Sequence, residues 1–131
     1  MIAVDTNILV RLLTDDDPKQ AADAGALVAA NPVWIAKTVL LETIWVLRSQ
    51  YGFGDHSIRQ AIAELLGLDN IQVEDPAQVA AALILGASDV DFADALHLCS
   101  RPPAAVFASF DRAFIRRARR AGIVDVAAVG S

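Results

Sequence analysis

The chain opens with the stretch MIAVDTN (residues 1–7), and this stretch decides the fold that we expect. Residues 2–4 have the composition of a short buried strand, and the helical spacing of apolar residues starts directly afterwards, at Ile8. Asp5 is therefore delivered to the carboxyl end of a strand, which is where open α/β sheets bind their ligands. The alternative is that Asp5 or Thr6 only caps the first helix, since both residue types do this well.

Short apolar strands alternate with helical patterns along the rest of the chain. The pattern predicts further strands at residues 33–36, 71–73, 104–108 and 124–129, with helices between them. Because parallel strands need crossover connections, this order is typical of a parallel sheet covered by helices. We therefore predict an α/β fold, a three-layer α/β/α sandwich with a central, mostly parallel sheet of about five strands, built as a single domain over residues 1–131.

The composition limits the classes of protein to which the chain can belong. Of the 131 residues, 55% are hydrophobic, but no apolar run approaches the roughly 18 to 20 residues of a membrane-spanning helix. We expect the excess apolar surface to meet another protein. No basic region precedes the first apolar stretch, so no secretory signal is predicted. Cys99 is the single cysteine, which excludes an intramolecular disulfide and fits a reducing cytoplasm.

The formal net charge of −5 argues against a nucleic-acid partner, but the distribution of the charges argues for one. Five of the eleven basic residues lie within residues 112–120. Helical spacing puts four of them on one stripe, opposite Phe114, Ile115 and Ala118. These four are Arg112, Arg116, Arg119 and Arg120. The stripe is either a solvated helix face or a binding surface for RNA phosphates.

Several aspartates have a structural explanation. Asp17, Asp55 and Asp75 stand at expected helix starts, so we assign them as caps. Asp15 and Asp16 belong to the turn before Pro18, and we expect them to be solvated or capping. None of these aspartates needs a catalytic role.

Other acids are candidates for chemistry. Glu42 lies in mid-helix among apolar residues, so it is either a carboxylate in surroundings low in water or part of a narrow exposed face with Thr38 and Ser49. Asp91 and Asp94 are three residues apart on one expected helix and therefore share a face. Asp91 can belong to the helix start, whereas Asp94 lies deeper and has no evident capping role.

Asp111 repeats the placement of Asp5, because it follows an expected strand and opens the Arg-rich helix. Its alternative role is again an N-cap. Ser109 can offer a hydroxyl to the same crevice. Carboxylates from two strand ends and two helices would then lie close together. Their negative charges would repel one another unless a cation neutralises them.

A hard divalent cation suits such a set of ligands. Carboxylate oxygens are typical ligands of Mg²⁺ and Mn²⁺. Zinc is not expected, because the candidate set lacks Cys and His pairs at ligand spacing. His97 could share a face with Asp94, but we interpret it as a structural histidine, and we interpret His56 as a surface residue near a helix start.

Four motifs, taken in order, resemble those of PIN-domain proteins. They are the hydrophobic-Asp-Thr-Asn opening, the mid-helix glutamate of LLETIW, the segment DFADALHL and the late SFDRAF. In length and order the chain is similar to the VapC toxins of VapBC toxin–antitoxin pairs. This resemblance implies a compact α/β/α fold and metal-dependent cleavage of RNA. It also implies a small antitoxin whose basic side chains enter the acidic pocket, and a homodimer.

The resemblance also implies a site, position by position. The acidic residues would be Asp5, Glu42, Asp94 and Asp111, with Asp5, Asp94 and Asp111 holding Mg²⁺ or Mn²⁺. Asp91 would be an auxiliary acid, and Thr6, Asn7 and Ser109 would support the site. Ser109 departs from the threonine that related sequences often carry, but the hydroxyl is retained.

Two other functions compete with this interpretation. Phosphotransfer domains and phosphatases of the haloacid-dehalogenase type also place aspartates and Mg²⁺ at strand ends. The phosphatases need a second aspartate where this chain has Asn7, and both classes need a late lysine, whereas Lys19 and Lys37 are both early. The other alternative is a non-catalytic, metal-stabilised module that binds RNA or acts as a scaffold.

Overall fold

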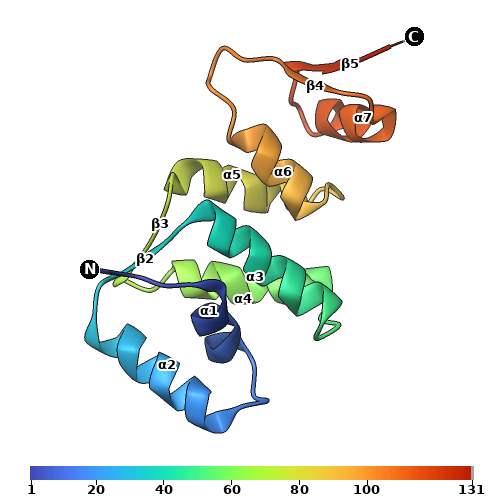
Figure 1. Ribbon diagram of the computed structural model, residues 1–131. Coiled ribbons are helices and arrows are strands. Elements are labelled where there is room, and N and C mark those ends of the chain that lie inside the picture. Colours follow the sequence, from blue (N-terminus) through green and yellow to red (C-terminus); the bar gives the residue numbers. More distant parts are fainter. Residues whose placement is uncertain (131) are drawn as a thin grey trace. The chain divides into compact units, whose positions relative to one another are not determined.

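The computed structural model of the chain describes residues 1–130 and divides into two compact units, Met1–Pro76 and Ala77–Ser131 (Figure 1). The first unit contains three strands and four helices. They are β1 (Ile2–Ala3), α1 (Thr6–Leu13), α2 (Pro18–Ala30), β2 (Val33–Ile35), α3 (Lys37–Ser49), α4 (Asp55–Leu66) and β3 (Ile71–Val73).

The three strands of the first unit form a parallel sheet in the order β1-β2-β3. Ile2 pairs with Val33, and Val33 pairs in turn with Ile71. The central strand β2 buries both Val33 and Ile35 completely, as a strand covered by helices should. Helix α1 packs against α2 and α3, and α4 packs against α3 and β3 (Figure 1).

The second unit continues the alternation of helices and strands. It contains α5 (Pro76–Gly86), whose first residue belongs to the first unit, followed by α6 (Phe92–Cys99), β4 (Phe107–Ser109), α7 (Arg112–Arg120) and β5 (Val126–Ala128). Strands β4 and β5 pair in parallel, and α7 packs against β5. The Phe107 and Phe114 rings meet edge to face, with centroids 5.7 Å apart, and so join α7 to β4.

The predicted strands at residues 33–36 and 71–73 are confirmed within one residue, but the late strands are shorter than predicted. Strand β4 begins at Phe107 instead of residue 104, because a turn occupies the segment after the two prolines. The Ala105 N–H donates to the Pro102 carbonyl at 3.0 Å, and the Arg101 guanidinium donates to the Ala105 carbonyl at 2.9 Å. β5 covers residues 126–128 of the predicted 124–129, and Val124 is exposed.

The helix starts agree with the sequence in part. Asp17 caps α2 as predicted, with its carboxylate accepting a hydrogen bond from the Gln20 N–H at 3.0 Å. The cap assigned to Asp55 is wrong, because Gly54 is the cap residue and Asp55 is the first residue of α4. The cap assigned to Asp75, directly before Pro76, stays a prediction; this residue has a φ of +46°, and its carboxylate pairs with the Lys37 ammonium at 3.0 Å.

The described strands all pair in parallel, so the predicted α/β fold with parallel strands is confirmed; they form a three-stranded and a two-stranded sheet, in place of the predicted single sheet of about five strands. None of the helices in residues 1–130 combines the length and the hydropathy that a bilayer crossing requires.

The packing of α3 can be tested at Leu40, which has no exposed surface. We expect Leu40→Ala to lower the free energy of unfolding by about 2–5 kcal/mol, because it removes buried methyl groups and leaves a cavity. Urea unfolding followed by circular dichroism measures this loss. Leu68→Ala is the matched control, since Leu68 is 49% exposed in the turn after α4, and it should change stability by less than about 0.5 kcal/mol. Equal losses in the two variants would contradict the assignment of Leu40 to the core.

Candidate acidic site

A pocket of about 460 Å³ opens between α1 and α3 in the first unit. Its acidic residues are Asp5 and Glu42, which are the two acids of this unit that the sequence predicts to act together. The supporting residues Thr6 and Asn7 line it as well. The remaining lining residues are Val10, Arg11, Val39, Val46, Gln50 and Tyr51. The first unit therefore brings its predicted site residues to one hollow.

Asp5 has the capping role that the sequence leaves open. Its backbone is extended (φ −94°, ψ 176°), and its Oδ1 atom accepts a hydrogen bond from the Ile8 N–H at 3.1 Å. The positive end of the α1 dipole favours a negative charge at this place. A carboxylate has two oxygens with four lone-pair positions, so one hydrogen bond to Oδ1 leaves Oδ2 able to bind a ligand. Capping and ligand binding at Asp5 are therefore compatible.

Glu42 lies on an exposed face of α3, together with Thr38 and Ser49. This confirms the exposed-face interpretation and excludes the interpretation of a carboxylate in surroundings low in water. The apolar neighbours point elsewhere, since Leu40 and Ile44 are buried. Because the pocket lies along this face, Glu42 contacts solvent inside the pocket while α3 keeps its opposite face in the core.

The second unit gathers the other predicted acids around Asp94. Partial burial of its carboxyl raises the pKa of Asp94, the negative charges of Asp91 and Asp111 raise it further, and His97 lowers it. Asp94 lies in the first turn of α6 and, as expected, does not cap the helix. Asp91 does, since its Oδ2 atom accepts from the Ala93 N–H at 3.1 Å. His97 is exposed, so its place in the structure is beside Asp94 and outside the core.

Asp111 caps α7, which confirms its structural role. Its Oδ1 atom accepts a hydrogen bond from the Phe114 N–H at 3.0 Å. The Ser109 hydroxyl oxygen accepts from the Asp111 N–H at 3.0 Å, so this hydroxyl fixes the backbone that carries the carboxylate. Asp5 and Asp111 thus have the same local construction, each being two residues beyond the end of a short strand and at the start of a helix.

The donor set of both units suits a hard divalent cation. Asp5 and Asp111 each keep one carboxylate oxygen outside the cap hydrogen bond, and the pKa of Asp94 is raised first by partial burial and then by the negative charges of Asp91 and Asp111. Within either unit, taken over the residues that the structure describes, no three Asp, Glu, His or Cys side chains form a metal-binding group. The ligands predicted for one ion are divided between the units, with Asp5 in one and Asp94 and Asp111 in the other.

A comparison with protein families matches residues 2–120 to the PIN domain. The chain belongs to the PIN-domain family. Among curated proteins, no sequence matched the chain. PIN domains have a nuclease-type fold and usually use divalent metals, which supports a nucleic-acid-cleaving role for this chain. Family membership and the order of helices and strands together confirm the predicted fold class, α/β/α with parallel strands.

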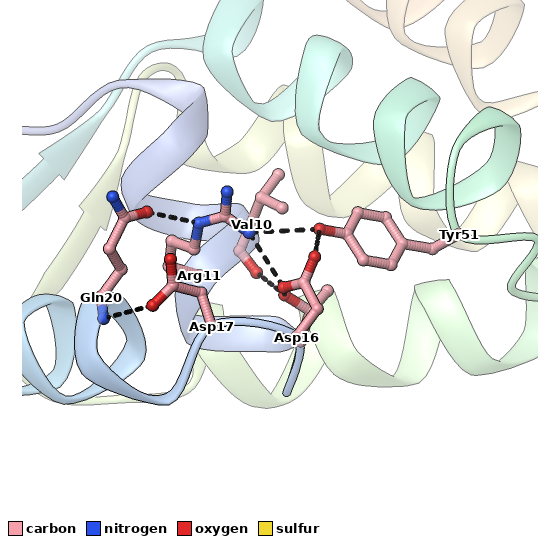
Figure 2. A network of polar contacts seen from close by, with 7 residues as sticks. Val10, Arg11, Asp16, Asp17, Gln20 and Tyr51 are labelled. Atoms are coloured by element: carbon pink, nitrogen blue, oxygen red, sulfur yellow. Dashed lines mark hydrogen bonds and ion pairs between the residues drawn. The ribbon is translucent and has the colours of Figure 1, made fainter.

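A polar network at the wall of the pocket in this PIN domain was not predicted from the sequence (Figure 2). The Arg11 guanidinium donates to the Asp16 carboxylate at 2.9 Å, to the Gln20 side-chain oxygen at 2.7 Å and to the Tyr51 hydroxyl at 3.3 Å. The Tyr51 hydroxyl donates in turn to Asp16 at 2.6 Å. Asp16 was assigned to a solvated or capping turn, and nothing in the sequence connects it to Tyr51, which lies 35 residues later. This network fixes the Arg11 and Tyr51 side chains in the wall of the pocket that Asp5 and Glu42 also line.

The arginine stripe of α7 divides into two pairs in the structure. Arg112 donates to the Gly130 carbonyl at 2.6 Å, and Arg119 donates to the Val126 carbonyl at 3.2 Å, so both hold the segment around β5. Arg116 and Arg120 are exposed on the same helix. The opposite face buries Phe114, Ile115 and Ala118 as predicted; these three are the buried residues of α7.

The network predicts a specific dependence of stability on pH. The hydrogen bond from Tyr51 is the first cause that lowers the pKa of Asp16, followed by those from Thr14 and Arg11. A lowered folded-state pKa contributes stability above the unfolded value of 3.8, and this contribution is lost as the pH falls through the folded value. We expect Tyr51→Phe to lower the melting temperature at pH 7 by about 2 to 4 °C, and by progressively less below about pH 4.

Thermal unfolding followed by circular dichroism between pH 2 and pH 8 tests this dependence. Ser57→Ala, which removes an exposed hydroxyl from α4, is the control and should give a small shift that does not change with pH. If Tyr51→Phe lowers the melting temperature by the same amount from pH 7 to pH 2, the hydrogen bond to Asp16 is not the contact through which Tyr51 stabilises the fold.

Proposed function

We propose that this PIN domain is a metal-dependent endoribonuclease and acts as the toxin of a type II toxin–antitoxin pair of the VapBC kind. The observation that carries the proposal is the grouping of the acids. The first unit places Asp5 and Glu42 in one pocket, and the second unit holds Asp94 within the electrostatic reach of Asp91 and Asp111. These are the positions that the resemblance to the family assigns to the acidic site.

In the proposed reaction, Asp5, Asp94 and Asp111 would hold Mg²⁺, or Mn²⁺ in its place. When bound, the cation polarises the scissile phosphate and lowers the pKa of water. Glu42 orients the attacking water or holds a second ion, and its exposure inside the pocket gives water access to its carboxylate. In-line attack leaves a 5′-phosphate and a 3′-hydroxyl.

The other named residues keep these carboxylates in place. Asp5 and Asp111 are each oriented by the N–H groups of the helix that they cap, and Ser109 fixes the backbone of Asp111. Asp91 is an auxiliary acid whose negative charge makes the electrostatic potential at Asp94 more negative. Thr6 and Asn7 line the pocket next to Asp5 and support it there.

Cleavage is the first test of this proposal. We expect Asp5→Asn and Asp94→Asn to lower the rate of RNA cleavage by about a hundredfold or more, because each removes a charge that would hold the cation. The assay incubates the purified chain with structured RNAs, with Mg²⁺, with Mn²⁺ and with a chelator, and follows the fragments on a gel. Asparagine caps helices as well as aspartate does, so the Asp5→Asn variant should fold normally.

Asp23→Asn is the matched control for cleavage. Asp23 lies on α2, pairs with Lys19 at 2.9 Å and does not line the acidic pocket, so its variant should cut RNA at the rate of the parent chain. Cleavage by Asp94→Asn at the parent rate would show that the acids are assigned wrongly. Divalent-dependent RNA binding without any cleavage would instead support the non-catalytic module.

The exposed arginines of α7 give a second test. In the proposed function Arg116 and Arg120 contact RNA phosphates, and each contact contributes about 0.7 to the slope of log K against log salt for a single strand. We expect Arg116→Glu with Arg120→Glu to weaken RNA binding and to lower this slope by about 1.4. Fluorescence anisotropy at several salt concentrations measures both. An unchanged slope would leave the stripe as a solvated face.

The partners belong to the same proposal. We propose a small antitoxin that places basic side chains in the acidic pocket, a homodimer, and a cytoplasmic location. Several large apolar side chains are exposed and support an association with other chains; the most exposed are Ile84, Phe110 and Val124. The neighbouring reading frame is the place to look for a short antitoxin chain, and co-purification of the two products tests the pairing.

A further inference from the structure

The pocket of the first unit has two chemically different ends. Asp5 caps the start of α1 and Arg11 lies six residues further along the same helix, which corresponds to about 9 Å at 1.5 Å per residue. The other wall of the pocket is similar. Its acid, Glu42, lies on α3, and Tyr51 follows two residues after the end of this helix, where its hydroxyl contacts Arg11. The acidic end is accounted for by the proposed chemistry. The end with Arg11 and Tyr51 is not.

Arg11 is anchored but has donors to spare. A guanidinium has five N–H groups, and three of them are used here, by Nε to Gln20 and by Nη1 to Asp16 and Tyr51. Among residues 1–130, none accepts a hydrogen bond from Nη2, and Figure 2 draws no contact from this nitrogen. The side chain keeps 23% of its surface exposed and lines the pocket. Arg11 is thus a rigidly held cation that can bind a phosphate through Nη2.

Tyr51 carries an aromatic platform next to this cation. The rings of Tyr51 and Phe53 are stacked, with centroids 5.8 Å apart and an interplanar angle of 23°. Gly52 between them has a φ of +69°, a left-handed conformation that glycine adopts without strain. The Phe53 N–H donates to the Leu47 carbonyl at 3.1 Å, so the loop is fixed to the end of α3. Phe53 stays 40% exposed, which leaves part of its ring open to a further stacking partner.

We propose that Arg11, Tyr51 and Phe53 form a subsite for one nucleotide of single-stranded RNA, with a phosphate on Arg11 Nη2 and a base stacked on the Phe53 ring. This inference rests on the proposed function, because the nucleotide belongs to the RNA strand whose phosphodiester bond is cut at the acidic end. A cation and a stacked aromatic pair are the two features by which proteins bind single strands irrespective of sequence. A duplex could not use this subsite, since its bases are stacked on one another.

The subsite also explains why a cation lies in a pocket with two carboxylates. A strand of phosphates would be repelled by Asp5 and Glu42, and a fixed positive group at the other end of the pocket would offset part of this repulsion. Because Asp16 and Tyr51 hold Arg11, the guanidinium cannot swing to Asp5 and neutralise it. The network therefore keeps the two ends of the pocket chemically distinct.

The experiment measures binding of a fluorescein-labelled oligoadenylate to the full chain carrying Asp5→Asn, in the presence of a chelator so that no RNA is cut. In this background we expect Phe53→Leu to weaken binding about fivefold to tenfold, and Phe53→Trp to bind as well as the parent or better. We expect Arg11→Gln to weaken binding and to lower the slope of log K against log salt by about 0.7, the loss of one phosphate contact.

Arg48→Gln is the matched control for Arg11→Gln. Arg48 also belongs to the first unit and pairs with an aspartate, Asp55, at 3.0 Å, but it does not line the pocket. Its variant should keep the parent slope, and equal losses in both variants would overturn the subsite by showing a general effect of charge. The Phe53 ring stacks on Tyr51, but none of the hydrogen bonds that hold Arg11 involves Phe53, so Phe53→Leu remains informative even where Arg11→Gln fails to fold.

Binding by folded Phe53→Leu at the parent affinity would also overturn the proposal. Failure of the subsite is distinct from failure of the proposed function. A chain that cleaves RNA in Mg²⁺ but binds equally well with and without Phe53 is a nuclease without this subsite. A chain that never cleaves RNA, but loses binding in the Phe53 and Arg11 variants, has the subsite without the proposed chemistry.

Discussion

The packing of α1 against α2 and α3 is the interaction on which the first unit and its pocket depend. This helix has only eight residues, too few to be stable in isolation, and it buries Leu9 and Val10 against its neighbours. Its other surface supplies one wall of the pocket, from Asp5 at its start to Arg11 near its end. The positions of a carboxylate and of a guanidinium are therefore both set by the burial of two apolar side chains.

The fold favours the ionised form of two of the candidate acids and disfavours the ionised form of a third. At the start of α1 and α7 the helix dipole and the free N–H groups favour the carboxylates of Asp5 and Asp111. At Asp94 the fold works against ionisation, because partial burial and the charges of Asp91 and Asp111 raise its pKa. A cation would relieve this repulsion, so metal binding and folding are expected to support each other in the second unit.

The sequence predicts local features well because these depend on neighbouring residues. The apolar runs at residues 33–36 and 71–73, and the Asp17-Pro18 helix start, are confirmed. The start of β4 is not predictable in the same way, because it depends on how Arg101 holds the turn after Pro103. Asp55 is not a cap, because α4 begins one residue earlier than predicted, with Gly54 as its cap residue, and the Asp55 carboxylate pairs with Arg48.

In the candidate site, too, local features can be predicted from the sequence, whereas contacts between distant residues cannot. The sequence singles out Asp5 and Glu42, and the structure places them in one pocket, while their shared role in catalysis stays a prediction. The place of Arg11 in the pocket cannot be predicted from the sequence, because a single arginine in an amphipathic helix forms no distinctive pattern. Its importance depends on Asp16 and Tyr51, which are five and forty residues away along the chain. Contacts of this kind arise from the tertiary fold and leave no periodic signal.

The cap hydrogen bonds have an evolutionary consequence. An amide oxygen accepts the hydrogen bonds from Ile8 and Phe114 as readily as a carboxylate oxygen does, so the cap hydrogen bonds by themselves do not require an acid at residues 5 and 111. Codons for aspartate and asparagine differ by one base. A single point mutation at either residue would therefore remove a carboxylate from the chain while leaving the cap and the fold in place.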